Sequence, residues 1–216
     1  MTSKFTAIIW DFGGVITSSP FDAFNRHEAA RGLPPDFIRT VNATNPDSNA
    51  WARFERSEIS ADQFDDIFAA EARALGQQVR GADVIALLAG DIRPRMVAAL
   101  DTLKAGGYKL GCITNNAPTG HGPGMTANAE KAAAIAGVMQ RFDHVIESSK
   151  AGIRKPDLRI YRMMTEALGV EPAGCIYLDD LGINCKPAAA LGMTAIKVNG
   201  EAQALAELGD YLNTSL

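Results

Sequence analysis

The chain has 216 residues, of which 47% are hydrophobic and 21% are charged, as in an ordinary globular protein. Its net charge is −4 with acidic and basic residues interspersed, so it lacks the basic stripe that nucleic-acid binding requires. No apolar run approaches the roughly 20 residues of a membrane span, and the first residues lack a secretory signal pattern. We therefore expect a cytoplasmic protein with no nucleic-acid and no membrane partner.

Short apolar runs alternate with helical patterns along most of the chain. This alternation is typical of an α/β fold, in which crossover helices join the strands of a parallel sheet. The runs show no polar alternation, as expected of strands that are covered on both faces. They comprise residues 7–10, 110–113, 144–146, 175–178 and 194–198.

Helical patterns separate the later runs. Pro94 and Pro156 each stand at the start of one such pattern, where proline is tolerated because its missing N–H is not needed. A short helix is expected from Pro187 to Leu191, ended by Gly192. Their apolar stripes are those of helices that pack on a sheet.

Residues 18–90 break this alternation, because they contain no convincing strand and indicate four or five helices. An all-helical block inserted after the first strand predicts a cap subdomain (18–90) on a core domain made of residues 1–17 and 91–216. The clearest cap helix begins at Ser60, with Gln63 three residues later as a capping box. Its expected buried face comprises Phe64, Ile67, Phe68, Ala72 and Leu75.

Polar residues follow four of the apolar runs directly. The carboxyl ends of parallel strands share one edge of the sheet, and ligands bind there in open α/β folds. Three carboxylates, a hydroxyl, two amides and a lysine should therefore lie close together. They belong to Asp11, Thr114, Asn115, Lys155, Asp179, Asp180 and Asn184.

This set of side chains suits phosphoryl transfer. A carboxylate can attack phosphorus, and neighbouring carboxylates stay ionised together only with a cation between them. A hard divalent ion with oxygen ligands, most plausibly Mg²⁺, removes that repulsion and polarises the phosphoryl group. A lysine and a hydroxyl then hold the oxygens on which charge resides in the transition state.

Each of these residues also has an ordinary structural interpretation. An aspartate after a strand, such as Asp11, is more often a turn or cap residue, and Asp179 and Asp180 would suit the cap of the next helix. Thr114 alone would be a strand-end hydroxyl, and Lys155 alone a solvated loop charge. Their joint occurrence at one sheet edge favours the catalytic interpretation.

Four motifs give the chain a family resemblance. Asp-Phe-Gly-Gly-Val-Ile begins at residue 11, Ile-Thr-Asn at 113, Gly-Ile-Arg-Lys-Pro at 152 and Leu-Asp-Asp-Leu-Gly-Ile-Asn at 178. In this order they resemble the motifs of the haloacid dehalogenase superfamily. More narrowly, essentially the whole chain is similar to the N-terminal phosphatase domain of soluble epoxide hydrolase and its bacterial relatives. The resemblance implies a Rossmann-like three-layer core, strand order 5-4-1-2-3, and a helical cap that selects the substrate.

The resemblance also implies an activity and a cofactor. The family includes Mg²⁺-dependent phosphatases that act on small organic phosphate monoesters through an aspartyl-phosphate, here on Asp11. By position, the metal ligands would be Asp11, the backbone carbonyl of Gly13, and Asp180. The partner would be a small phosphorylated molecule.

The remaining motif residues take roles around this centre by the same resemblance. Thr114 and Lys155 would be catalytic residues that bind the transferred phosphoryl group, with Asn115 beside them. Asp179 and Asn184 would act through water or by orienting their neighbours. These roles are expectations that follow from the motif positions.

One position departs from the family's phosphatase pattern. Those enzymes usually have an aspartate two residues after the nucleophile, which protonates the leaving group and later activates water; this chain has Gly13. Positioned acid–base catalysis contributes roughly 10²–10⁴-fold. Two alternatives therefore stay open: a weakly active or inactive phospho-ligand-binding protein, and a dehalogenase-type C–X hydrolase. His121 is a candidate replacement proton donor, and Trp51 and Phe54 are candidates for the cap core or the substrate cavity.

Overall fold

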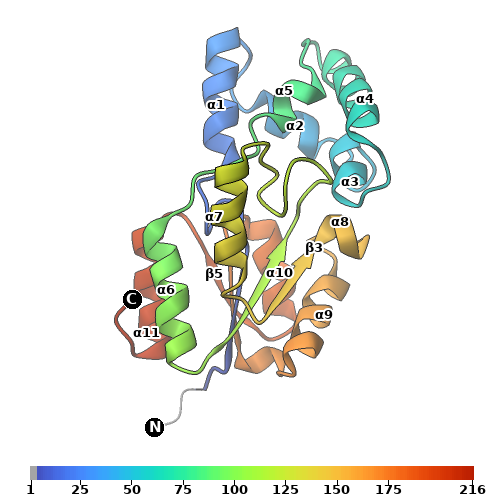
Figure 1. Ribbon diagram of the computed structural model, residues 1–216. Coiled ribbons are helices and arrows are strands. Elements are labelled where there is room, and N and C mark those ends of the chain that lie inside the picture. The colour runs from blue at the N-terminus through green and yellow to red at the C-terminus, as the bar shows by residue number, and fades with distance from the viewer. Residues whose placement is uncertain (1–3) are drawn as a thin grey trace.

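The computed structural model describes residues 4–216, and its centre is one parallel five-stranded sheet. The strand order is β3-β2-β1-β4-β5, which confirms the α/β fold and the predicted order (Figure 1). The first strand is central, with β2 and β4 as its two neighbours. The strands are β1 (Ala7–Trp10), β2 (Lys109–Thr114), β3 (His144–Glu147), β4 (Cys175–Asp179) and β5 (Thr194–Lys197).

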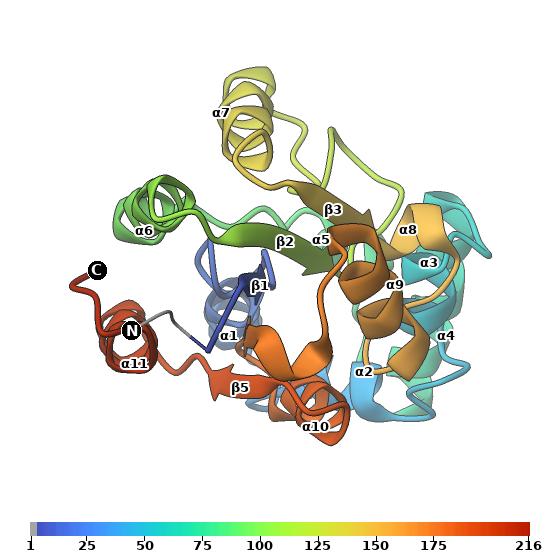
Figure 2. The same ribbon diagram turned by 90° about the horizontal axis from the view of Figure 1, so that it is seen from below.

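Helices cover both faces of the sheet, so alternate residues of each strand enter different hydrophobic clusters (Figure 2). In β1, Ile8 and Trp10 pack in the cluster under α6 (Pro94–Ala105) and α11 (Glu201–Leu212). Ala7 and Ile9 pack in the cluster under α9 (Leu158–Leu168) and α10 (Gly182–Ala190). This double burial explains why the strands are apolar throughout.

One core helix differs from its prediction. The helix expected from Pro187 begins at Gly182, so Pro187 lies inside α10 rather than at its start. Proline favours the first turn because it lacks the N–H that a helix interior uses, yet here it lies inside the helix. The core also contains helix α7 (Ala129–Met139), the short helix α8 (Ser148–Ala151) and the 3₁₀ helix η1 (Pro172–Gly174). Within residues 4–216, no helix is long and apolar enough to cross a membrane.

The cap consists of helices between β1 and α6, and it lies beyond the carboxyl ends of the strands (Figure 1). Its own hydrophobic cluster centres on Phe64, which stacks on Phe54 with 4.7 Å between ring centroids. The capping box of Ser60 and Gln63 is present at the start of α4. The helices are α1 (Pro20–Arg31), α2 (Phe37–Ala43), α3 (Ala50–Glu55), α4 (Ala61–Ala74) and α5 (Gly81–Ile85).

Leu75 is the exception on the predicted buried face of α4. It is 41% exposed, because the helix ends at Ala74 and residue 75 has left the apolar stripe as its C-cap. The assignment of residues 18–90 to a separate cap subdomain, and of residues 1–17 and 91–216 to the core, stays a prediction.

The two connections between cap and core run side by side as a short antiparallel pair. Thr17 bridges Ile92, and the Ser18 N–H donates to the Asp91 carbonyl over 2.8 Å. Gly90 lies against this pair, where an added Cβ would collide with the Ser18 carbonyl oxygen and the Thr17 side chain. Glycine is therefore required here for close approach of the two connections.

Substituting Gly90→Ala should lower the free energy of unfolding by about 1–3 kcal/mol, because the new methyl group overpacks the connections. Gly137→Ala is the matched control, since an added Cβ in α7 meets open space and alanine favours a helix. That variant should be stabilised by about 0.4–1 kcal/mol. Urea unfolding measures both, and equal stability of the two variants would contradict the role of Gly90.

Candidate active site

Three carboxylates meet at the carboxyl edge of the sheet, where the two central strands end. Asp11 follows β1 directly, Asp179 is the last residue of β4, and Asp180 follows it. Ligand oxygens of the three lie within 4.8 Å of one another. Asp11 and Asp179 are buried, so their charges are held in a medium of low dielectric.

Lys155 lies between two of these carboxylates and is itself buried. Its Nζ is 2.8 Å from Asp11 Oδ1 and 2.8 Å from Asp179 Oδ2. Burial would lower the pKa of Lys155, but the two carboxylates outweigh that effect and hold the pKa above its usual range. The lysine is therefore a fixed positive charge at the end of β1.

Asp179 is fully occupied by hydrogen bonds in addition to this ion pair. The Tyr177 hydroxyl donates to Oδ2 (2.6 Å), the Leu181 N–H donates to Oδ1 (2.8 Å), and Asn184 Nδ2 lies 3.1 Å from both oxygens. The Tyr161 hydroxyl in turn donates to the Asn184 carbonyl (2.8 Å). With its oxygens used in this way, Asp179 is suited to hold Lys155 rather than to bind a ligand directly.

Asp180 contrasts with its neighbour. Its side chain has one weak hydrogen bond among the described residues, from the Ser19 hydroxyl at 3.5 Å. Burial, and then the charge of Asp179, raise the pKa of Asp180 to about 6. Three carboxylates and one ammonium sum to a charge of −2, so the donor set fits one divalent cation bound at Asp180 and Asp11.

Asp11 has one oxygen engaged and one available. Oδ1 accepts the Phe12 N–H (2.6 Å) and contacts Lys155, whereas no described residue donates to Oδ2. Burial raises the pKa of Asp11 well above its usual value, and Lys155 opposes that rise. This geometry leaves a carboxylate oxygen for attack or for a metal ligand.

Thr114 and Asn115 occupy the neighbouring end of β2. The Thr114 side chain is buried and makes no hydrogen bond with the described residues. The Asn115 amide is bound to the backbone of Lys155 at both ends: Oδ1 accepts its N–H (2.9 Å) and Nδ2 donates to its carbonyl (3.0 Å). Asn115 thus fixes the main chain of Lys155.

The two glycines that follow Phe12 differ in what they require. Gly14 has a positive φ of 75°, and a Cβ there would collide with the Asp180 carboxylate. At Gly13 an added Cβ meets no atom within 4 Å, and the backbone is outside the left-handed region. The backbone therefore dictates Gly14 but leaves room for a side chain at residue 13.

His121 is exposed, and its side chain bonds to none of the site residues in the part of the chain that the structure describes. Phe54 lies in the hydrophobic cluster of the cap and Trp51 packs against that cluster, which is one of the two interpretations that the sequence left open. Tyr177 was missed because its strand was interpreted as apolar. The signal was its spacing, since residues two apart in a strand share a face and Tyr177 precedes Asp179 by two.

The chain thus combines a parallel five-stranded sheet with a carboxylate–lysine cluster at its carboxyl edge. The sequence matches the model of the haloacid dehalogenase-like hydrolase family over residues 5–192, and the chain belongs to that family. Phosphatase MT3486 of Mycobacterium tuberculosis is 31% identical over 92% of the chain and 89% of its own length. The predicted family is therefore confirmed.

Two mouse proteins match nearly the whole chain but are much longer. Acyl-CoA dehydrogenase family member 10 is 31% identical over 99% of the chain, and bifunctional epoxide hydrolase 2 is 30% identical over 95%. The chain spans only 20% and 38% of their respective lengths. The resemblance to epoxide hydrolase thus concerns one part of that protein.

Solved structures share the fold at low sequence identity. A HAD family enzyme of Bacteroides thetaiotaomicron, in complex with magnesium and inorganic phosphate, has a TM-score of 0.59 at 18% identity, covering 91% of this chain and 96% of its own. L-2-haloacid dehalogenase of Xanthobacter autotrophicus has a TM-score of 0.61 at 20% identity, covering 95% and 82%. The fold alone does not separate these two chemistries.

Asp180 should make the stability of the metal-free protein depend on pH. Its pKa is about 6 in the folded protein and about 3.9 in an unfolded chain. Between these values the folded state holds a proton that the unfolded state releases, so stability rises as pH falls from 7 to 4. We expect a gain of about 1–3 kcal/mol, measured by urea unfolding with a chelator.

Asp180→Asn is the control for this effect, because it removes the group that takes up the proton. The variant should lose the part of the gain that Asp180 causes and keep the part from Asp11, whose pKa is also raised. An unchanged pH dependence in the variant would show that other carboxyl groups, and not Asp180, cause it.

Proposed function

We propose that this protein is a Mg²⁺-dependent phosphatase that hydrolyses a small organic phosphate monoester through an aspartyl-phosphate on Asp11. The observation that supports it best is the buried Lys155, which contacts Asp11 at 2.8 Å while Asp180 is left with ligand oxygens to spare. Phosphatase MT3486 and the magnesium- and phosphate-bound HAD enzyme support the same activity.

In the proposed reaction Asp11 Oδ2 attacks phosphorus and the bond to the ester oxygen breaks. The leaving oxygen departs as an alkoxide or phenolate that takes a proton from solvent water, and the phosphoryl group stays on Asp11. Water then attacks phosphorus, which releases inorganic phosphate and regenerates the carboxylate. Lys155 Nζ and the Thr114 hydroxyl bind phosphoryl oxygens, where negative charge resides in the transition state. Thr114 has the hydroxyl free for this role.

The magnesium ion would be held by Asp11, Asp180 and the Gly13 carbonyl. Asp179 and Asn184 would not bind it directly and would orient their neighbours. The ion supplies charge neutralisation and polarises the phosphoryl group. The net charge of −2 among the carboxylates and the lysine would otherwise repel an anionic substrate. The same repulsion disfavours a metal-free reaction on a haloacid, so we do not favour the C–X hydrolase.

Asp180→Asn should therefore remove measurable Mg²⁺ binding, whereas Asp179→Asn should weaken it by about 10–100-fold. The reason is that Asp180 has free oxygens, while those of Asp179 are hydrogen-bonded. Isothermal titration with Mg²⁺ measures both variants. Equal losses would show that the direct and outer positions are assigned wrongly.

Gly13 should limit the substrates that are turned over quickly. Without a carboxyl group at residue 13, the leaving oxygen departs largely unprotonated. Aryl phosphates should react much faster than alkyl phosphates. Gly13→Asp should raise kcat/KM for an alkyl phosphate by about 10–100-fold, since an added side chain meets open space there.

The measurement is kcat/KM for p-nitrophenyl phosphate and an alkyl phosphate in the wild type and both Asp11→Asn and Gly13→Asp. Asp11→Asn should remove turnover of both esters, because no nucleophile remains. Equally fast turnover of both esters by the wild type would show that another group supplies the proton. Tight phosphate-ester binding without turnover in the wild type would favour the alternative of a phospho-ligand-binding protein.

A further inference from the structure

One set of polar contacts between cap and core converges on α8 and the loop that follows it. The Ser57 hydroxyl donates to the Ser149 carbonyl over 2.7 Å. Arg154 Nη1 donates to the Pro46 carbonyl over 3.0 Å. Both contacts join the segments that flank helix α3 in the cap to the stretch directly before Lys155.

An ion pair with a buried carboxylate lies among these contacts, and its arginine side chain is 20% exposed. Arg154 Nε is 2.7 Å from Glu55 Oε2, and the Glu55 side chain is only 5% exposed. Burial raises the pKa of Glu55, while Arg154 and then Lys155 oppose the rise, so the carboxylate lies within electrostatic range of the active-site lysine. Glu55 is the last residue of α3 and belongs to the cap.

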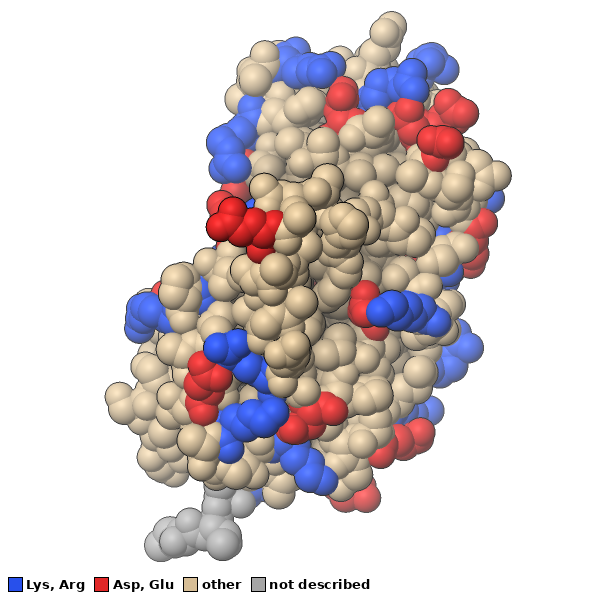
Figure 3. Space-filling model, viewed as in Figure 1, with Lys and Arg blue, Asp and Glu red and all other residues tan. Residues whose placement is uncertain are grey.

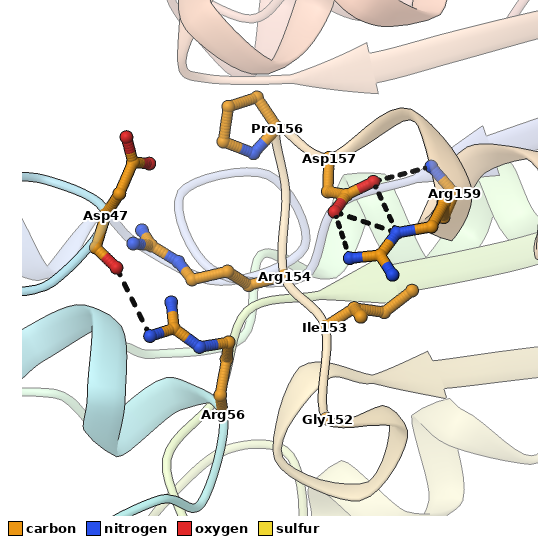
Figure 4. Close-up of a pocket in the computed structure, with 8 residues that line it drawn as sticks. All are labelled: Asp47, Arg56, Gly152, Ile153, Arg154, Pro156, Asp157 and Arg159. Atoms are coloured by element: carbon orange, nitrogen blue, oxygen red, sulfur yellow. Dashed lines mark hydrogen bonds and ion pairs between the residues drawn. The ribbon is translucent and has the colours of Figure 1, made fainter.

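The Arg154 side chain extends from the loop before α9 toward the cap segment that carries Asp47 and Arg56 (Figure 4). It lies in a hollow of about 410 Å³ between cap and core, which it shares with Arg56 and Arg159. Those two arginines are paired locally: Arg56 with Glu58 in the cap, and Arg159 with Asp157 in the core. Among these three arginines, Arg154 alone pairs across the boundary, since it lies in the core and its partner Glu55 lies in the cap.

The burial of the pair indicates a role in geometry rather than in stability alone. Taking two charges out of water costs much of what their attraction returns, so such pairs contribute little net stability. Separating the two partners, however, leaves the charge of Glu55 uncompensated. The pair therefore favours the arrangement of cap and core in which Glu55 and Arg154 meet. That arrangement is the cap placed over the active site.

Displacement of Arg154 would be transmitted directly to the lysine. Arg154 and Lys155 are adjacent, and Asn115 binds the Lys155 N–H and carbonyl on the other side. The main chain of Lys155 is thus held by a core amide, and the side chain of the preceding residue, Arg154, is held by a cap carboxylate. Shifts of about 1 Å in a group that binds the reacting atoms can reduce rates by 10²-fold.

We propose that Glu55 is a positioning residue, whose ion pair with Arg154 fixes the cap against the α8–α9 loop and thereby places Lys155 beside Asp11. The kinetic consequence rests on the proposed phosphatase function. The structural consequence does not rest on that function: Glu55, in the cap, orders residues 148–155 of the core.

Hydrogen–deuterium exchange of the full chain without ligand tests the structural consequence. Glu55→Gln and Arg154→Met should each speed amide exchange in both residues 46–57 and residues 148–155. Glu58→Gln breaks the exposed Arg56–Glu58 pair within the cap and is the matched control, which should leave residues 148–155 unchanged. Unchanged exchange of residues 148–155 in Glu55→Gln overturns the proposal. If Glu55→Gln does not fold, Glu55→Asp keeps the charge, shortens the reach, and should show the same coupled change to a smaller degree.

Steady-state kinetics on p-nitrophenyl phosphate tests the positioning role. In Glu55→Gln, kcat should fall by about 10–100-fold with a smaller change in KM, and Glu55→Asp should restore part of it. The double variant Glu55→Gln/Arg154→Met should lose no more than either single variant, because both remove the same pair. Additive losses, or a wild-type kcat per folded molecule in Glu55→Gln, overturn it. An inactive wild type overturns the phosphatase function instead, and the exchange experiment then still decides the role of Glu55.

Discussion

The site depends on one interaction, the buried ammonium of Lys155 between Asp11 and Asp179. A lysine in this position is unfavourable unless both its partners are carboxylates, and each carboxylate is unfavourable without the lysine. The three groups come from the ends of β1 and β4 and from the α8–α9 loop. The attraction among these three groups therefore holds the α8–α9 loop at the edge of the sheet. The hydrogen bonds of Asp179 with Tyr177 and Asn184 then orient this triad from within the core.

The same cluster is not neutral, and its imbalance has a functional meaning. Lys155 compensates one of three carboxylates, and Asp180 is the group left without a close partner among the described residues. Burial raises its pKa most, and the charge of Asp179 adds to the rise, so an ionised Asp180 is unfavourable in the absence of a cation. A core built for stability alone would pair or remove that charge. Because the charge is kept, a cation that binds between these carboxylates would relieve their repulsion.

Apolar runs predicted the strands and the residues gathered at one edge of the sheet, because parallel strands end together. The strand order was implied by the family resemblance, and the structure confirms it. Position within a helix was less predictable: Pro187 suggested a start where the helix continues, and Leu75 falls at a C-cap just beyond the stripe. Tyr177 was hidden in an apolar run. The contacts of Glu55 with Arg154 and of Ser57 with Ser149 join residues about 90 or more apart, on segments with no periodicity. Nothing local in the sequence specifies such pairs.

Two adjacent glycines show how structural and chemical constraints can be separated. Gly14 is dictated by its positive φ and by the Asp180 carboxylate that occupies the space of a side chain. Gly13 is under neither constraint, so its lack of a carboxyl group is not a consequence of folding. In the proposed reaction no group at residue 13 donates a proton to the leaving oxygen. The rate therefore depends more on how well Lys155 stabilises the negative charge of the transition state. The placement of Lys155, and with it the proposed role of the Glu55–Arg154 ion pair, then matters more than in a site that has its own acid.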